Sequence, residues 1–134
     1  IFGCPMWVFY TNRGQAITSA GAHDKDRAII EFQPANKAYR SVALKCFRTF
    51  LKVDNKFYEP FSETSDNKKD MRITSHDLTL VETNQKLKLK VEVNYFTIPN
   101  EQFPGLARTV KITNLANKPR NSVLDPRNLE EKIS

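Results

Sequence analysis

One nine-residue stretch, Leu87-Lys-Leu-Lys-Val-Glu-Val-Asn-Tyr95, alternates apolar and polar side chains without interruption. Alternation with a period of two is what a β-strand needs when one face meets a core and the other meets water. An α-helix of the same sequence would spread its apolar side chains around the whole cylinder. The stretch therefore predicts a half-buried strand that must pair with neighbouring strands.

Short segments with strand character recur along the rest of the chain, and turn signals such as Asp54-Asn55 and Thr83-Asn-Gln85 separate them. Seven to nine strands with turns at this spacing are typical of an antiparallel β-sandwich. A short helix is expected at most once, within 36–46. We interpret residues 62–70 as a polar loop and 126–134 as a polar tail, which leaves 1–125 as the β-sandwich domain. The segments with strand character, of which seven to nine are expected to form strands, are 6–10, 15–18, 28–32, 47–53, 56–59, 71–73, 77–82, 87–95, 106–113 and from 122 onward.

The charge balance favours an ordinary solvated surface over a nucleic-acid interface. The chain of 134 residues carries 21 basic and 15 acidic side chains, a net charge of +6. A basic surface attracts phosphates, RNA or acidic sugars, but here the two signs are interleaved along the sequence. No apolar run reaches the length of a membrane-spanning helix or a signal-peptide core. We therefore expect a cytoplasmic protein with no nucleic-acid and no membrane partner.

Metal ligands and redox groups are sparse. Cys4 and Cys46 are the only cysteines; they could form one disulfide, but two reduced thiols are the favoured interpretation. His23 and His76 stand apart, without the spacing of zinc ligands. The sequence therefore predicts no metal and no cofactor.

Carboxylates offer no clear catalytic arrangement either. Asp24 and Asp26 are too few for a calcium loop. Glu59 and Glu101 each lie beside a proline-containing turn, and paired carboxylates are what glycosidases use. Nothing in the sequence brings these two together, so surface salt bridges are the favoured interpretation.

Three longer blocks of the chain have a recognisable sequence. They are Pro5-Met-Trp-Val-Phe-Tyr-Thr-Asn-Arg-Gly-Gln15, the segment from Asn36-Lys-Ala-Tyr39 through Phe47-Arg-Thr-Phe50 to Phe57-Tyr-Glu-Pro-Phe61, and Val93-Asn-Tyr-Phe-Thr-Ile-Pro-Asn-Glu101 with Leu106-Ala-Arg-Thr-Val-Lys-Ile-Thr-Asn114. These blocks resemble the N-terminal domain of bacterial glycoside phosphorylases of glycoside hydrolase family 94, in the cellobiose phosphorylase-like branch that contains 1,2-β-oligoglucan phosphorylase. The resemblance covers roughly residues 3 to 125.

This resemblance implies a β-supersandwich of the galactose mutarotase-like type that precedes a helical linker and a catalytic (α/α)6 barrel. In such enzymes the barrel carries the general acid and the phosphate site, and phosphorolysis releases α-glucose 1-phosphate with inversion. No catalytic residue of the barrel can be assigned here. The segment after Asp125 departs from the family pattern, so we expect an incomplete sandwich, which favours self-association through unpaired edges.

Two functions follow as expectations. The first is a non-catalytic sandwich fragment of a carbohydrate-active phosphorylase, inactive alone, whose partners are the barrel or another copy of itself, as a homo-oligomer. The alternative is a carbohydrate-binding module for β-linked glucose oligomers, with ligand contacts from Asn12, Arg13, Arg48 and Glu101. Each of these four residues also has a structural interpretation as a turn, ion-pair or capping residue. A self-sufficient enzyme and an RNA-binding module are the less favoured alternatives.

Overall fold

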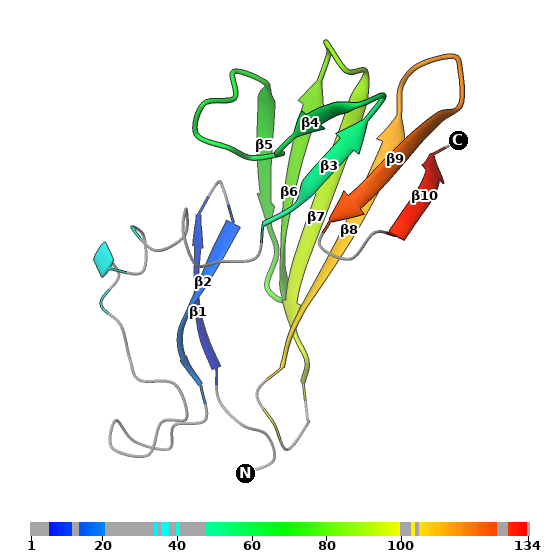
Figure 1. The fold of residues 1–134 in the computed structure, drawn as a ribbon. Coiled ribbons are helices and arrows are strands. Elements are labelled where there is room, and N and C mark those ends of the chain that lie inside the picture. The colour runs from blue at the N-terminus through cyan, green and yellow to red at the C-terminus, as the bar shows by residue number, and fades with distance from the viewer. Residues whose placement is uncertain are drawn as a thin grey trace.

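The computed structural model describes residues 6–11, 14–20, 34, 36–37, 40, 48–99, 103, 105–125 and 129–133, with 6–11, 14–20, 121–125 and 129–133 described by their backbone alone. This part of the chain forms antiparallel sheets with the orders β1-β2, β10-β9-β3-β4 and β5-β6-β7-β8 (Figure 1). The all-β, antiparallel class predicted from the sequence is confirmed. The strands are β1 (Met6–Thr11), β2 (Gly14–Ala20), β3 (Phe50–Val53), β4 (Lys56–Tyr58), β5 (Lys68–Ile73), β6 (Asp77–Asn84), β7 (Leu89–Thr97), β8 (Leu106–Asn114), β9 (Arg120–Asp125) and β10 (Leu129–Ile133).

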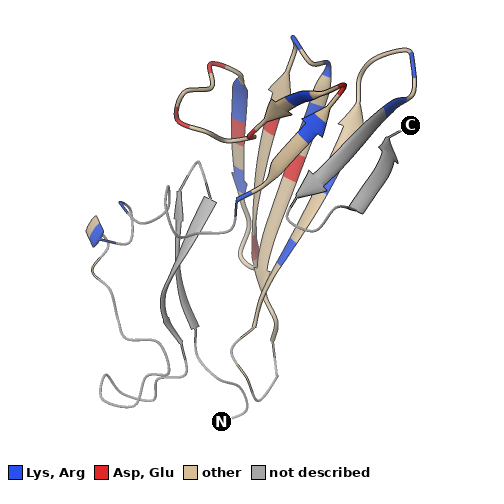
Figure 2. Cartoon of the chain, in the orientation of Figure 1, with Lys and Arg blue, Asp and Glu red and all other residues tan. Residues whose placement is uncertain are grey.

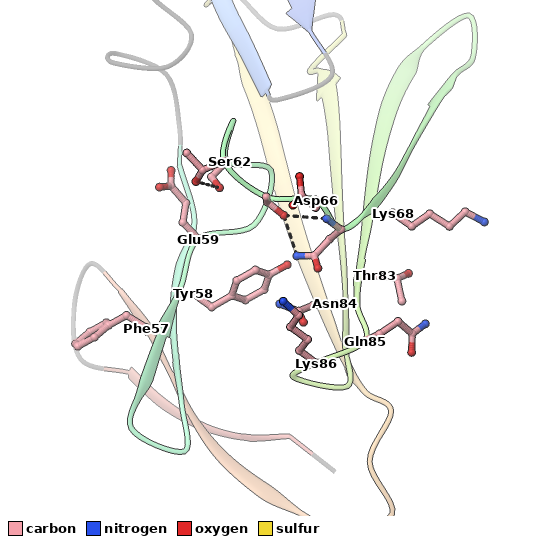
Figure 3. Close-up of a pocket in the computed structure, with 13 residues that line it drawn as sticks. Phe57, Tyr58, Glu59, Ser62, Asp66, Lys68, Thr83, Asn84, Gln85 and Lys86 are labelled. Atoms are coloured by element: carbon pink, nitrogen blue, oxygen red, sulfur yellow. Dashed lines mark hydrogen bonds between the residues drawn. The ribbon is translucent and has the colours of Figure 1, made fainter.

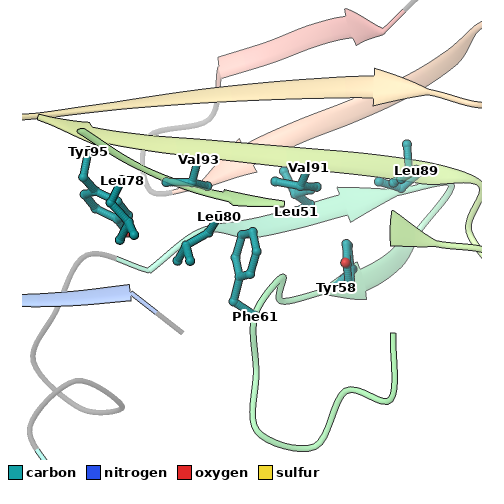
Figure 4. Close-up of a cluster of buried hydrophobic side chains, with 10 residues drawn as sticks. Leu51, Tyr58, Phe61, Leu78, Leu80, Leu89, Val91, Val93 and Tyr95 are labelled. Carbon is teal, nitrogen blue, oxygen red and sulfur yellow. The ribbon is translucent and has the colours of Figure 1, made fainter. Parts of the chain in front are cut away.

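The two four-stranded sheets form the layers of a sandwich, and one hydrophobic core lies between them. Leu51 and Val53 come from β3, and they pack with Leu80, Val91 and other residues of the β6–β7 hairpin. Figure 4 shows these side chains together in the space between the layers. The arrangement is that of an incomplete β-sandwich, because the sheets do not cover one another completely at the β5 side.

The predicted alternation of apolar and polar residues is confirmed in β7 from Leu89 to Tyr95. Leu89, Val91 and Val93 are 0 % exposed and Tyr95 is 1 % exposed, whereas the residues between them are partly exposed. The neighbouring strands keep the same register, since Val93 lies opposite Leu80 of β6 and Val110 of β8. Inward-facing positions therefore form continuous rows across the sheet.

Two predicted turns are present, one of them with a shifted boundary. Asp54 and Asn55 have φ angles of 47° and 64°, so the β3–β4 hairpin has a two-residue loop with both residues in the left-handed region. The β6–β7 loop spans residues 85–88, and pairing resumes only at Leu89 rather than at the expected Leu87. The shift arises because Asn84 Oδ1 accepts the Leu87 N–H at 2.9 Å and Lys88 adopts a φ of 50°.

The interpretation of 62–70 as loop was wrong for its last three residues. β5 already begins at Lys68, and all six of its residues pair with β6, from Lys68 opposite Thr83 to Ile73 opposite Leu78. At the far end of this hairpin the Thr74 hydroxyl donates to Asp77 Oδ1 at 2.5 Å. This hydrogen bond and, to a smaller extent, the one from Asn94 Nδ2 hold the pKa of Asp77 below its ordinary value. Pairing with β6 therefore extends a segment whose composition is polar.

Other expectations meet the structure only in part. Residues 129–133, interpreted as a polar tail, form β10 against β9. In the segment 36–46 the structure describes only Asn36, Lys37 and Arg40, whose backbone is helical. The strand expected at 28–32 and both cysteines lie outside the described residues.

Arg120 holds together three turns at one end of the sandwich. One of its terminal nitrogens donates to the backbone carbonyl of Leu87 at 2.6 Å and to that of Lys88 at 3.3 Å. The other lies 3.5 Å from Asp54 Oδ2 in the β3–β4 turn. The same side chain also reaches Asn114 Oδ1 at 3.3 Å, where β8 ends. A guanidinium can link several loops in this way because its donors are fixed in one plane.

Candidate functional site

The most distinctive polar feature of the described structure is a fully buried carboxylate, Glu82, which is 0 % exposed. It lies on β6 two residues after Leu80 and therefore points toward the core between the sheets. Burial of an isolated carboxylate is costly unless hydrogen-bond donors replace the lost water. Glu82 must therefore have its donors supplied by the fold.

Four donors surround Glu82, one from Tyr58 at the end of β4 and three from the loop that joins β4 to β5. Oε1 accepts from the Tyr58 hydroxyl at 2.5 Å, from Ser65 Oγ at 3.1 Å and from Asn67 Nδ2 at 2.8 Å. Oε2 accepts from the backbone N–H of Phe61 at 2.6 Å. Since Tyr58 belongs to the opposite sheet, this network ties together both layers and the intervening 59–67 loop.

Phe61 has an unfavourable backbone conformation, which the hydrogen-bond network around Glu82 stabilises. Its φ of 64° is in the left-handed region, which is unfavourable for an aromatic residue by about 1 kcal/mol or more. Its ring is 6 % exposed and belongs to the core cluster, and its N–H is the donor to Glu82. Figure 4 shows the ring beside Leu80. Burial and the charge-assisted hydrogen bond together stabilise a backbone shape that the residue would not adopt alone.

Tyr58 acts as a permanent donor in this network. Burial raises the pKa of the Tyr58 hydroxyl well above its ordinary value, and the hydrogen bond to Glu82 and the charge of Glu82 raise it further. Ionisation would place two negative charges side by side in a buried position. The hydroxyl therefore keeps its proton at any physiological pH.

An open hollow of ≈ 600 Å³ lies above this network, between the end of β4, the 59–67 loop and the β6–β7 turn. Figure 3 draws the residues that line the hollow. Among them, the Tyr58 hydroxyl and Ser65 Oγ already donate to Glu82, and Asn67 Nδ2 donates to Ser65 Oγ at 2.8 Å. Its rim is exposed and mostly polar, and an aromatic ring, Phe57, stands at its edge with 83 % of its surface exposed. In Figure 3 the Phe57 ring points away from the hollow's interior. The rim includes Asp66, Lys68, Gln85 and Lys86.

Among the four residues that the sequence singled out for ligand contact, only Arg48 is described. Its Nε and a terminal nitrogen donate to the two carboxylate oxygens of Glu59 at 2.6 and 2.7 Å, and its guanidinium lies 4.9 Å from the centre of the Phe50 ring. The expected salt bridge of Glu59 is thereby confirmed. Asn12, Arg13 and Glu101 lie outside the described residues, so their proposed sugar contacts stay predictions.

Sequence reasoning did not identify Glu82, although a signal for it exists. Glu82 has the same parity as Leu78 and Leu80 in the strand predicted over 77–82, so it was due to face the core. An inward-facing carboxylate implies dedicated donors nearby. What the sequence does not contain is which loop supplies them, because the donors lie 15 to 24 residues away along the chain.

Arg108 makes a further polar contact between the sheets, away from Glu82. Arg108 of β8 stands opposite Tyr95 of β7, donates through Nε to the Tyr95 hydroxyl at 3.0 Å and also bonds Thr49, just before β3. It therefore links the two sheets with polar contacts, as Glu82 does elsewhere. Charged positions of both signs also occur along the described strands (Figure 2), in agreement with their interleaving in the sequence.

The described residues were also compared with what a metal site or a membrane-spanning helix requires. The described part of the chain holds no group of three or more His, Cys, Asp or Glu that could bind a metal ion. It also holds no helix long and apolar enough to cross a membrane. A comparison of the chain with protein-family models, with curated proteins and with solved structures finds no match.

Replacing the carboxylate should destabilise the sandwich. The variant Glu82→Gln offers one acceptor oxygen and turns an NH2 group toward donors, which leaves buried groups unsatisfied at about 1–3 kcal/mol each. We expect a loss of at least about 2 kcal/mol in the free energy of unfolding, measured by urea denaturation. The matched control is Glu92→Gln on the outer face of β7, where the carboxylate is 3.1 Å from Lys90 Nζ and a change below about 1 kcal/mol is expected. Equal stability of Glu82→Gln and the wild type would contradict this role.

The raised pKa of Tyr58 predicts alkaline sensitivity. The folded state retains the phenol proton, whereas the unfolded chain releases it above about pH 10. Tyr58 therefore contributes its full stabilisation below pH 10 and loses it as pH rises toward the folded-state pKa, with a slope of up to about 1.4 kcal/mol per pH unit. Urea denaturation between pH 8 and 11 should show a shallower decline for Tyr58→Phe, which is also less stable at pH 8. Parallel curves for the two proteins would rule out this contribution.

Proposed function

We propose that this chain is a non-catalytic β-sandwich module of a bacterial, carbohydrate-active phosphorylase of glycoside hydrolase family 94. Its role is to pack against the catalytic (α/α)6 barrel and against a second copy. The proposal rests on the resemblance of three sequence blocks and is supported by the incomplete antiparallel sandwich. It includes a cytoplasmic location, no cofactor or metal, and no nucleic-acid or membrane partner.

The observation that carries the supporting role is that two carboxylates, Glu82 and Glu59, are bound by groups of the fold itself. Glu82 has four donors and no exposed surface. Glu59, at the rim of the hollow, is held by both oxygens in the ion pair with Arg48. A glycosyl-transfer site needs carboxyl groups that can reach a sugar ring. These two instead serve the packing of the loop and of the strand ends.

The apolar surface also fits a packing role. Met71 and Ile73 of β5 lie opposite Leu80 and Leu78 and so continue the inner face of the sheet, yet they are 47 % and 70 % exposed. The core of the sandwich thus extends beyond the part that the second sheet covers. A module that docks on a larger assembly is expected to present such a face.

A second candidate function, binding of β-linked glucose oligomers, is favoured by one specific observation. Phe57 presents an almost fully exposed ring beside a hollow whose rim carries Asp66, Lys68 and Gln85. Sugars combine stacking of their C–H faces on an aromatic ring with hydrogen bonds to polar side chains. The outward direction of the ring places any stacking on the outer rim rather than inside the hollow (Figure 3).

The supporting role is tested by complementation in trans. A family 94 barrel expressed without its own sandwich is mixed with this chain, and release of α-glucose 1-phosphate from β-glucooligosaccharides and phosphate is measured. We expect no turnover by the chain alone and a gain of activity or solubility when barrel and chain are combined. An unrelated β-sandwich of similar size is the control. Phosphate-dependent turnover by this chain alone would refute the non-catalytic assignment.

The binding alternative is tested by amide NMR titration with β-1,2- and β-1,4-glucooligosaccharides. If the rim binds sugar, shifts should cluster at the ends of β4 and β6, and Phe57→Ala should weaken the affinity by about five- to tenfold, since loss of an aromatic contact costs about 1 kcal/mol or more. Phe103→Ala is the matched control, because this ring is 55 % exposed and does not line the hollow. A dispersed spectrum without shifts would favour the pure packing role.

A further inference from the structure

The edge strand β5 has hydrogen-bonding groups that the sheet does not use. In the order β5-β6-β7-β8, β5 is paired on one side only (Figure 1). The other long edge, β8, contacts β10 of the opposite sheet, whereas β4 has only three residues. Among the described strands, β5 is therefore the longest unpaired edge on its side of the sandwich, and five of its six residues are exposed.

The direction of each backbone group along β5 follows from the register. The Thr74 N–H donates to the Asp77 carbonyl at 3.0 Å, which makes this a hydrogen-bonded pair. Because bonding alternates along an antiparallel ladder, even-numbered residues of β5 bond β6, while the N–H and C=O groups of Lys69, Met71 and Ile73 point to the open edge. Continued through β6, this alternation makes the even-numbered residues of β7 bond β8. The bond from the Ile98 N–H, just after β7, to the Gly105 carbonyl, just before β8, agrees with it.

This alternation restricts how two β5 strands could pair about a two-fold axis. Only odd-numbered residues can face one another as hydrogen-bonded pairs, so the axis must pass through an odd residue or midway between two odd residues, at an even one. An axis at Lys69, Asp70 or Arg72 would place that residue opposite its own copy, with like charges in direct contact. An axis at Met71 or at Ile73 places an apolar residue there instead. An axis at Ile73, the last residue of β5, would pair the rest of the strand with the turn residues 74–76, so Met71 gives the longer ladder.

With the axis at Met71, the charges of β5 become complementary. Asp70 then lies opposite Arg72 of the second copy, and by symmetry this pair occurs twice. Neither residue faces a charge within its own sheet, since their partners on β6 are Val81 and Thr79. Asp70 has only a long contact of 3.9 Å, to Lys68. The same register places Lys69 opposite Ile73, and Lys69 Nζ is already bound to the carbonyls of Ser62 and Ser65.

We propose that two copies of this chain associate through antiparallel pairing of β5 with β5, centred on Met71, to form a continuous eight-stranded sheet. The charged residues of β5 disfavour axes at positions 68, 69, 70 and 72, in the manner by which edge lysines prevent unspecific strand addition, and the short ladder disfavours an axis at Ile73. The exposed Met71 side chains meet at the axis on the inner face, where each sheet leaves its apolar row uncovered. The inference specifies the self-association contained in the proposed function but rests on β5 alone.

A charge exchange tests the register directly. Sedimentation velocity and light scattering of the full chain should show a dimer whose dissociation constant depends on salt. Asp70→Arg and Arg72→Asp each create two like-charge pairs and should raise the dissociation constant at least about tenfold. The double variant Asp70→Arg/Arg72→Asp restores both pairs in reversed order and should return to within about threefold of the wild type. Both positions are exposed, and thermal unfolding verifies that each variant folds.

A backbone variant provides an independent readout. In Met71→Pro the lost N–H is one that points to the open edge, so the ladder with β6 is retained while dimerisation should be abolished. Leu115→Asp, at an exposed apolar position outside β5, should leave the dimer intact. A monomeric wild type at millimolar concentration, or a double charge variant no tighter than the single ones, would overturn the proposal. Either result leaves the complementation assay with the barrel unaffected, so the two failures can be told apart.

Discussion

The buried carboxylate of Glu82 is the interaction on which the other features of this sandwich depend. A charge without contact with water is unfavourable in a protein interior by several kcal/mol unless donors surround it closely. Here the donors are a hydroxyl on the opposite sheet, a backbone N–H and two side chains of one loop. If any of the four were absent, the remaining donors would have to hold a partly unsatisfied charge. The position of the loop is therefore determined by the requirement of one oxygen pair rather than by its own composition.

This requirement explains the local features near the network. In its left-handed backbone conformation Phe61 presents its N–H to Glu82 while its ring enters the core. Lys69 is on the inner face of β5 next to Glu82 in the register, and its amine is drawn to the carbonyls of Ser62 and Ser65. The loop thus covers the first part of β5. It does not reach Met71 and Ile73, which is why the apolar row ends in exposed residues.

The parts of the fold that could be predicted from sequence are those set by neighbours along the chain. The alternation in β7, the two-residue turn at Asp54-Asn55 and the β6–β7 hairpin follow from period and turn chemistry, and all three are confirmed. The extent of β5 was missed because Lys68 to Asp70 have weak strand propensity, and pairing with β6 overrides it. Glu82 was missed for a related reason: its partners are distant in sequence, and no local pattern identifies which hydroxyl or amide will satisfy a buried carboxylate.

Whether the hydrogen-bonding groups of a side chain are used within the fold also bears on function. A side chain whose hydrogen-bonding capacity is exhausted within the fold can shape a surface but cannot also take up a substrate without breaking those bonds. Glu82, which is fully buried with four donors, is in this position, and Arg48 engages both oxygens of Glu59. The capacity that stays unused in the described sandwich is instead found in the backbone edge of β5 and the apolar row beside it. Unused backbone donors and exposed apolar side chains are satisfied by another strand and another surface, and this is the physical basis of the association with protein that we propose.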